Sequence, residues 1–587
     1  MRKGVKGREI YIAAASMRTA LGGDVHSACE AIVRGESGLG PTPPGGRVSP
    51  RPVFAGLIPD SDYASLERRF GPGYSRAEML AAEAVANVIE PLKAGPGLGR
   101  TGLVIATAKG NVSMLEGRCG NGPFIPGENS PLLLKVFAER IAELSGFPAG
   151  AATLVSNACI SGVAAIVIAR RMILSGDYDN VAVVGVDVQN RFIVSGFSSF
   201  KSLSPDICRP YDESRCGLNL GEACGAVLLT DDRELAGPDA IRVDGGAISD
   251  DANHISGPSR TGDGLFFAMR NAACGAGLPL SAIDAVQLHG TATVYNDEME
   301  SRAISLAGLS DVPVQSLKPY FGHTMGASGV IETIMLAEQM KRGLFAGTPG
   351  FCRPGLPCPL SVSSGTRRVE MKHCLKTASG FGGTNAAIVL SAADTVPECA
   401  EFHPRRSLPV RTLKISEGRV ELDGRTVFSS DAGFDAFIRE AFRSRGSANM
   451  KFYKMDSACK LAYVAAEWLL DGIEFGEEEC AVLMSGRYGS LDTDMNHQSI
   501  IDREGDDYAA PSVFVYTLPN VAAAEISIRH HIKGENIWFS DAPMAELRHQ
   551  AELASARESL KYCLVGRSDF INGEYLAIFE LLRFGEV

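Results

Sequence analysis

Cys159 stands where a cysteine could act as a nucleophile, in the run SNACISGVAAIVIARRMILSGDYD. A short polar turn precedes it, and apolar residues then continue at helical spacing up to Gly176, which supplies a helix stop. The positive end of a helix dipole favours the thiolate of a cysteine placed there. The pattern predicts a reactive thiol at the start of a helix, and the small residues Gly162, Ala164 and Ala165 allow that helix tight surroundings.

Two histidine motifs strengthen this prediction. His289 follows the apolar, strand-like run AIDAVQL, and His323 lies in the glycine-flanked loop of KPYFGHTMGASG. Lys318 precedes His323 by five residues, and Glu332 lies in the helical pattern that follows. Any one of these residues alone is typical of a hydrogen-bonded loop or a solvated surface. Their occurrence together with the cysteine in one chain indicates a catalytic site.

A glycine-rich turn, GFGGTN, holds Phe381, Thr384 and Asn385 before a strand. With Cys159, HGTATVYNDEMES and KPYFGHTMGASG, in this order, it resembles the elongating β-ketoacyl-acyl carrier protein synthases, which are condensing enzymes of fatty-acid and polyketide synthesis. The resemblance extends over residues 8–392 and includes RPYDESRCGLNLGEACGAVLL at 209–229. It implies an α/β thiolase fold, with layers αβαβα and two mixed sheets, usually in a dimer.

The resemblance also assigns roles. Cys159 would carry the acyl chain as a thioester, and His289 and His323 would stabilise the enolate formed when a malonyl thioester loses carbon dioxide. The backbone amides of Cys159 and Phe381 would form an oxyanion hole. The remaining matches are a support pair, Lys318 and Glu332, and substrate-binding positions at Thr291, Thr293, Thr384 and Asn385.

Other functions stay open at this point. A non-condensing partner of the chain-length-factor type usually lacks the cysteine, which is present here. A thiolase-type acyltransferase would use Cys159 without decarboxylation, whereas the pair of histidines favours decarboxylation. Cys216 and Cys224 depart from the family pattern at 209–229, and we interpret both as packing variants.

Composition limits the function further. The net charge of −12 argues against nucleic acid as a partner. Fourteen cysteines without metal-ligand spacing favour a reducing, cytoplasmic setting with no metal and no disulfide framework. We expect no signal peptide, no membrane span and no cofactor beyond the phosphopantetheine of the carrier.

An acidic acyl carrier protein would need a local basic patch for docking. Lys201, in SGFSSFKSLSP, matches a docking position of the family, and Arg68 and Arg69, in LERRFGPG, are weaker candidates. The resemblance leaves open a homodimer or a heterodimer with a related synthase.

The resemblance to the family ends near residue 392, and we expect the synthase domain to span residues 1–395. Residues 396–410 are rich in proline and charge and are predicted to form a linker. Beyond it, in a predicted domain at 411–587, residues 452–566 resemble a second copy of residues 74–185, and alignment of FSDAPMAELR with VSNACISGVA puts Pro543 in the place of Cys159. Proline offers neither a nucleophile nor an amide N–H. His530 and His531 are expected on the surface, so this half-copy, similar to the half-length proteins of aryl polyene-type pathways, is predicted to be non-catalytic.

Overall fold

The computed structural model describes residues 8–93, 98–119, 124–396, 402–446 and 448–585. In the first of its sheets, parallel strands lie at one edge and antiparallel strands at the other. The strand order is β5 (Ala152–Val155), β4 (Thr101–Ala106), β6 (Asn180–Asp187), β8 (Ala223–Thr230) and β1 (Tyr11–Thr19). These strands are almost continuously apolar because both faces of the sheet are covered.

A second mixed sheet carries the histidine and glycine-turn motifs at its strand ends. Its order is β9 (Arg242–Asp250), β16 (Thr384–Ser391), β15 (His373–Gly380), β10 (Ala285–Gln287), β11 (Pro313–Gln315) and β13 (Ser361–Val362). Two buried helices, α6 (Ser161–Leu174) and α12 (Ser328–Arg342), contact both sheets.

Further helices cover the outer faces: α3 (Arg76–Val88) lies on the first sheet, and α9 (Asp263–Gly275) lies on the second. The resulting layers are the αβαβα arrangement of the thiolase fold that the sequence predicts.

The C-terminal part, from residue 407 on, repeats the first sheet. Its strand order is β17 (Ser407–Ser416), β23 (Glu574–Phe584), β22 (Tyr562–Ile571), β20 (Cys480–Gly486) and β21 (Asn536–Ser540), with the same parallel and antiparallel pairings. Three helices occupy corresponding places: α14 (Ser457–Leu469), α17 (Val521–His530) and α18 (Met544–Ala554). We call residues 407–585 the module.

The repeat is therefore longer than the sequence indicates, and the linker is shorter. Residues 407–410 belong to β17 and pair with β23, so the predicted linker over 396–410 is wrong at its C-terminal end. Part of it, 397–401, lies outside the described residues. The sequence does not reveal the first strand of the repeat, β17, because an inserted hairpin follows it. This hairpin consists of β18 (Arg419–Leu422) and β19 (Arg425–Ser429) and separates β17 from helix α13 (Phe434–Ser444).

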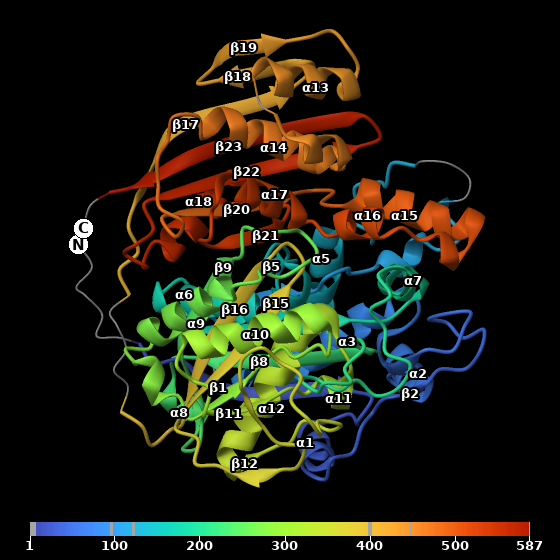
Figure 1. Ribbon diagram of the computed structural model, residues 1–587, viewed down its shortest axis with the longest axis vertical. Helices are drawn as coiled ribbons and strands as arrows, with labels where there is room; N and C mark the ends of the chain where they lie inside the picture. Colours follow the sequence, from blue (N-terminus) through green and yellow to red (C-terminus); the bar gives the residue numbers. More distant parts are fainter. Residues whose placement is uncertain (1–7, 94–97, 120–123, 397–401, 447, 586–587) are drawn as a thin grey trace.

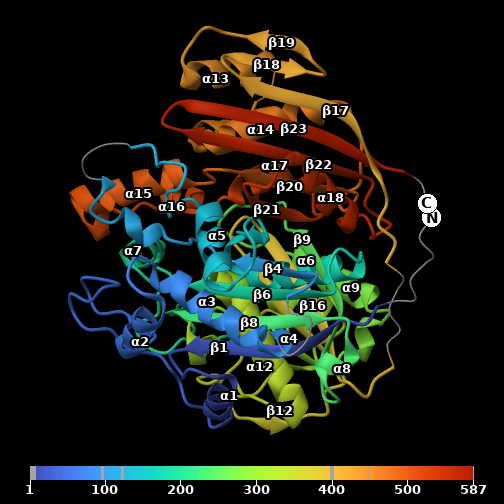
Figure 2. The ribbon, with the colours of Figure 1, turned by 180° about the vertical axis from the view of Figure 1, so that it is seen from behind.

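The first sheet and the module's sheet meet edge to edge at β5 and β21 (Figures 1 and 2). Val155 pairs antiparallel with Phe539, and the N–H of Ser156 donates to the carbonyl of Trp538 at 3.1 Å. Val155 and Phe539 are equivalent positions of the two copies. A pseudo-twofold axis therefore passes between them, as in a dimer built from one chain.

The inner face of the module's sheet is covered by α18 and by the first domain. Leu547 and Ala551 of α18 pack in one apolar cluster with Ile166 and Met172 of α6. At the rim of this contact, Arg171 forms a 2.6 Å ion pair with Glu535. The apolar face that half of a two-repeat fold must bury is therefore closed within this chain.

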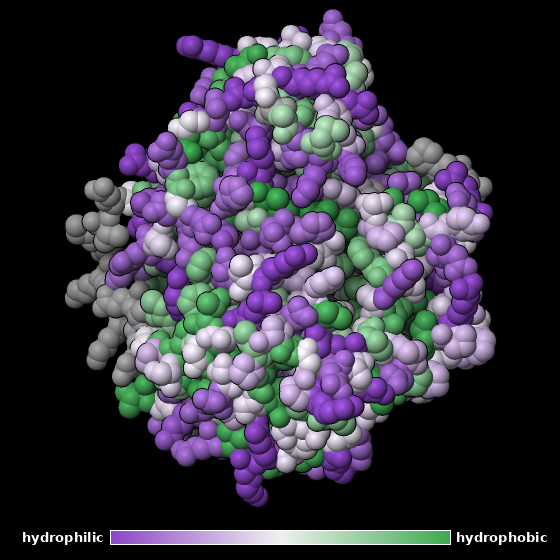
Figure 3. Space-filling view, viewed as in Figure 1, coloured by the Kyte–Doolittle hydropathy of each residue, from purple (hydrophilic) through white to green (hydrophobic). Residues whose placement is uncertain are grey.

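Elsewhere the surface is mixed. Hydrophilic and hydrophobic residues alternate over the face drawn in Figure 3. Among the helices in the described ranges, none has both the length and the apolar character that crossing a bilayer requires.

Removal of the module should leave the β5 edge and its apolar neighbours exposed to water. A chain ending at residue 395 is expected to give less soluble protein and to bind more of a hydrophobic dye than the full chain. Size-exclusion chromatography and dye fluorescence measure this. A monodisperse fragment with the dye binding of the parent would contradict it.

Candidate active site

Cys159 lies at a sharp turn between β5 and α6. The turn is made by Ala158, whose φ of 48° is left-handed, and Cys159 itself lies in a short 3₁₀ turn that leads into the helix. Its side chain is almost buried, with 7% of the residue exposed. The sequence prediction of a thiol at a helix start therefore describes its place in the structure.

Both histidines lie beside this thiol although they are far away in the sequence. His289 follows β10, and His323 follows the short helix α11 (Lys318–Phe321). The Nε2 atom of His323 lies 3.0 Å from Sγ of Cys159, and the centroids of the two imidazole rings are 5.0 Å apart. One ligating atom from each of the three residues fits within 4.8 Å of the others.

Hydrogen bonds fix the tautomer of His323. Its Nδ1 accepts the backbone N–H of Met325 at 3.2 Å and also lies 3.2 Å from the Ser328 hydroxyl. Burial and the charge of Lys318 lower the pKa of His323 well below 6.5, so the ring is neutral. A neutral ring whose Nδ1 accepts carries its proton on Nε2, which faces the thiol. His323 is therefore a hydrogen-bond donor toward the reacting atoms.

The support pair that the resemblance implies is a buried triad. Glu332 of α12 forms ion pairs with Lys318 and with Lys376 of β15, the latter at 2.8 Å. Burial opposes ionisation of Glu332, but the two lysines hold its pKa below the ordinary value. The sequence reasoning missed Lys376, which faces inward from the strand that leads to GFGGTN.

Lys318 of the triad also acts on the thiol. Burial raises the pKa of Cys159 to about 12, while the charge of Lys318 and the N–H of Phe381 act in the opposite direction. The positive charge of Lys318 also opposes a metal ion at Cys159, His289 and His323, although their atoms are close enough to ligate one. The reaction must therefore form the thiolate transiently, under nearby donors.

The glycine turn brings Phe381 to the thiol. Its N–H is directed at Cys159, and its ring stacks on Phe197 with centroids 6.1 Å apart. Thr384 is buried below the turn. Asn385 uses its amide within the turn, where it donates to Asp251 at 2.8 Å and accepts from Ser379 at 2.7 Å. Asn385, expected to bind substrate, thus holds the turn.

A second acid that the sequence reasoning missed supports His289. The carboxylate of Glu300 accepts the N–H groups of His289 at 2.7 Å and Gly290 at 2.9 Å, and burial raises its pKa to about 7. The hydroxyls of Thr291 and Thr293 are 2.9 Å apart at the start of α10 (Val294–Leu306). Glu300 is the second glutamate of NDEMES, within the segment that resembles the family.

A cavity of about 790 Å³ lies beside α10, and its lining residues do not include Cys159, His289 or His323. It is lined by α10 and by residues 253–260, and that loop meets the glycine turn, since Gly382 N–H donates to Ile255 O at 2.7 Å. Its basic residues are Arg260, Arg302 and Lys451, the last from the module. Lys201, Arg68 and Arg69 are exposed but do not line it.

Cys216 and Cys224 differ from each other. Cys224 is buried in β8, as a packing variant would be. Cys216 is exposed, so its interpretation as a packing variant is wrong.

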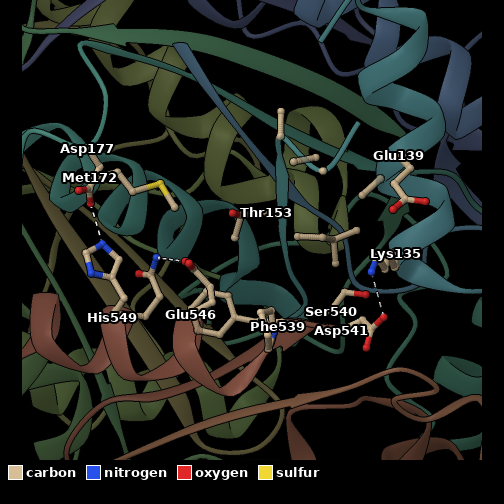
Figure 4. A pocket seen from close by; sticks show the side chains of 18 of the residues that line it. Lys135, Glu139, Thr153, Met172, Asp177, Phe539, Ser540, Asp541, Glu546 and His549 are labelled. Carbon is tan, nitrogen blue, oxygen red and sulfur yellow. Dashed lines mark hydrogen bonds and ion pairs between the residues drawn. The ribbon is translucent and has the colours of Figure 1, made fainter. Parts of the chain in front are cut away.

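Pro543 lies at the start of α18 and lines a cavity of about 530 Å³ between the module and the first domain (Figure 4). An ion pair lies on each of two sides of this cavity. His549 pairs with Asp177 at 2.7 Å on one side, and Lys135 pairs with Asp541 at 3.3 Å on the other. No thiol lines this cavity, and no second cysteine–histidine cluster occurs in the described parts of the chain.

Comparison with known proteins agrees with this geometry. Residues 7–234 match the model of the β-ketoacyl synthase N-terminal domain, and residues 240–351 match that of the β-ketoacyl synthase C-terminal domain. The thiolase-like fold with a Cys–His–His site thus defines a condensing enzyme of the acyltransferase class. The chain belongs to the β-ketoacyl synthase family.

Two relatives are named 3-oxoacyl-acyl-carrier-protein synthase 2. That of Vibrio harveyi is 26% identical over 413 residues, with 65% of this chain and 98% of the relative covered. That of Rhizobium meliloti (strain 1021) is 33% identical over 251 residues, and the match covers 40% of this chain and 59% of the relative.

Two solved structures extend the comparison. The PfaC keto synthase–chain length factor aligns with 98% of this chain and 78% of its own, with a TM-score of 0.75 and 14% identity, and this likeness concerns the fold alone. The ketosynthase ApeO, solved with its chain length factor ApeC from Xenorhabdus doucetiae, is 26% identical over 66% of this chain and 98% of its own, with a TM-score of 0.56.

The depressed pKa of both histidines predicts an unusual pH profile. Burial lowers the pKa of His289 and of His323 well below 6.5, so both rings stay neutral as the pH falls through 6.5. Protonation of the two rings should therefore add no transition at 6.5 to malonyl decarboxylation by the acyl-free protein, whereas Glu300, with its pKa raised to about 7, can add one. Release of carbon dioxide by the parent and by Glu300→Gln separates the two, with circular dichroism as the control for folding. A fall centred at 6.5 that persists in Glu300→Gln would contradict the assignment.

Proposed function

We propose that this chain catalyses decarboxylative Claisen condensation, with Cys159 as the acyl carrier and His289 and His323 as donors to the malonyl thioester oxygen. The observation that carries the proposal is the 3.0 Å approach of His323 Nε2 to Cys159 Sγ, with the ring proton held on that nitrogen.

In the first half-reaction, the sulfur of Cys159 attacks an acyl thioester and expels the carrier thiol, which takes the proton. The N–H groups of Cys159 and Phe381 are placed to receive the negative oxygen of the intermediate. In the second, a malonyl thioester loses carbon dioxide, and its enolate carbon attacks the acyl group on Cys159. The new carbon–carbon bond forms as the sulfur leaves, and a β-ketoacyl thioester remains on the carrier.

The alternatives explain less. A non-condensing partner has no need of a buried thiol facing a donor at 3.0 Å. A thiolase-type acyltransferase would use Cys159 without decarboxylation and has no need of two imidazole donors, whereas the rings of His289 and His323 lie together beside the thiol, with centroids 5.0 Å apart.

The test measures the role of the Cys159 thiol separately from the roles of the two imidazole rings. Incubation with acyl-carrier protein should place the acyl group on the Cys159 peptide, as seen by mass spectrometry, and Cys159→Ala should abolish it. His289→Ala and His323→Ala should keep acyl transfer but lose decarboxylation by roughly 10²–10³ each, the usual cost of one oxyanion donor.

Acylation that survives in Cys159→Ala, or decarboxylation at the parent rate in both histidine variants, would refute the proposal. Malonyl-coenzyme A in place of the malonyl carrier serves as the control for carrier recognition.

We assign an acyl carrier protein as partner, entering by the cavity beside α10. Arg260, Arg302 and Lys451 supply positive charge there for a phosphopantetheine arm on an acidic carrier. We also place the reaction in the cytoplasm, since the cysteines of the described residues are free thiols.

The module takes the place of a chain-length-factor-like partner. It lacks a nucleophile at Pro543, yet it contributes to the surroundings of the acylated thiol. Phe514 of α16 (Pro511–Phe514) packs edge-on against Phe197, at 5.5 Å, and Phe200, at 6.3 Å, and both of these contact Phe381. Its ring rests on Gly196, where any Cβ would overlap it. We infer that Phe514 limits the space for an acyl chain on Cys159 through these ring contacts.

Phe514→Ala should open that space and shift the products toward longer acyl chains, with Cys159 still acylated by short primers. Truncation of a buried Phe costs about 3–5 kcal/mol, so the melting temperature is measured alongside. The matched control, Phe434→Ala, removes a partly buried module ring that is packed on Phe570 and Tyr575. The same product profile in both variants and in the parent would contradict the role of Phe514.

A further inference from the structure

Helix α17 of the module holds the glycine turn of the first domain. The amide of Asn520, at the N-terminus of this helix, donates from Nδ2 to the carbonyl of Phe381 at 2.9 Å. A Cβ at Gly382 would lie 2.6 Å from that Nδ2 and 3.3 Å from Ala524, so the turn lies directly on the helix. Asn520 is fully buried.

The glycine turn that Asn520 contacts is the one that faces the thiol of Cys159. The N–H of Phe381 is directed at Cys159, and the backbone of Gly380 packs against the Cys159 amide, with its ideal Cβ 3.1 Å from that nitrogen. A shift of this turn would therefore change both donors of the oxyanion hole relative to each other. Among the described residues, the Phe381 carbonyl accepts one further hydrogen bond, a long one of 3.5 Å from the Thr384 hydroxyl.

The second oxyanion donor is also held from the module. Asn157, two residues before Cys159, donates to the carbonyl of Asn536 at 2.7 Å and accepts the N–H of Trp538 at 2.6 Å. These backbone groups belong to β21. The module thus contacts both sides of the oxyanion hole, one through β21 and one through α17.

The pseudo-twofold axis provides an internal comparison. Helix α5 (Leu134–Leu144) corresponds to α17, and both end in the same hydrogen bond, from Phe147 N–H to Ala142 O and from Ile532 N–H to Ser527 O. Superposition of these ends aligns Lys135 with Asn520, and therefore Glu139 with Ala524.

Lys135 and Glu139 face the 530 Å³ cavity in place of a glycine turn (Figure 4). No counterpart of the turn at 380–383 is among the residues that line this cavity. On that side the position of Asn520 is occupied by an exposed lysine paired with Asp541. Of the two equivalent helices, α17 contacts the glycine turn at 380–383 and has the small buried amide of Asn520 at this position, whereas α5 has neither among the described residues.

From this comparison we propose that Asn520 is a positioning residue of the active site, through which the module sets the oxyanion hole of the first domain. The inference rests on the proposed function and deepens it. The module acts on the reaction itself, by fixing the Phe381 carbonyl so that the Phe381 N–H stays aimed at Cys159.

The experiment compares Asn520→Ala and the similarly sized Asn520→Leu, which lacks the donor, in the full chain. The matched control is Glu478→Gln, which weakens another contact between module and first domain, the ion pair with Arg270 at 2.6 Å. We expect acylation of Cys159 to slow by about tenfold or more in both Asn520 variants, while KM for the acyl carrier changes little. Glu478→Gln should retain the parent rate.

Alkylation of Cys159 by iodoacetamide gives a readout that needs no substrate. Loss of the Phe381 N–H raises the pKa of the thiol, so alkylation at ~pH 9 should slow in the Asn520 variants and not in the control. Parent rates of acylation and alkylation in both folded Asn520 variants would overturn the inference. Absence of acylation in the parent would instead refute the proposed function, and the alkylation result would still decide the role of Asn520.

Discussion

The pairing of β5 with β21 is the contact on which the rest of this molecule depends. A strand edge with free N–H and C=O groups is unstable in water-excluding surroundings and invites pairing with another chain. Here the edge that ends just before the nucleophile pairs with its own repeat. The turn at Ala158 is left-handed, and its neighbour Asn157 is hydrogen-bonded to the repeat's backbone. The strained geometry of the nucleophile is thus stabilised by a segment almost 400 residues further along the chain.

Electrostatics then decide what the site can do. A thiol and two imidazoles in a dry pocket would all be neutral, because burial disfavours their charged forms. The buried triad of Glu332 with Lys318 and Lys376 brings the positive charge of Lys318 near them. This charge lowers the pKa of the thiol and, together with burial as the larger cause, lowers the pKa of both rings. The site therefore stabilises developing negative charge with fixed dipoles and a fixed cation.

Much of this could be predicted from the sequence, because the motifs of the catalytic residues are local. Cys159, His289 and His323 stand in short segments whose turn and helix signals are strong, and the αβαβα layers follow from the family that these segments resemble. Lys376 and Glu300 were not predicted, since a buried charge inside a strand or helix pattern has no local signal and is recognised only from its partner. The roles of Asn520 and Phe514 depend on contacts across the pseudo-twofold axis. No spacing rule within one segment reports such contacts, and the inserted hairpin hid the start of the repeat.

The fusion of the two halves also has a consequence for behaviour on dilution. Two separate subunits that share an active site lose activity when their concentration falls below the dissociation constant. In this chain the second half is tethered, so its effective concentration near the first is fixed by the connecting segment and not by the amount of protein. The site can therefore remain assembled in a cell that holds only a few copies. The two halves are also always made in equal numbers, so neither is left without the other.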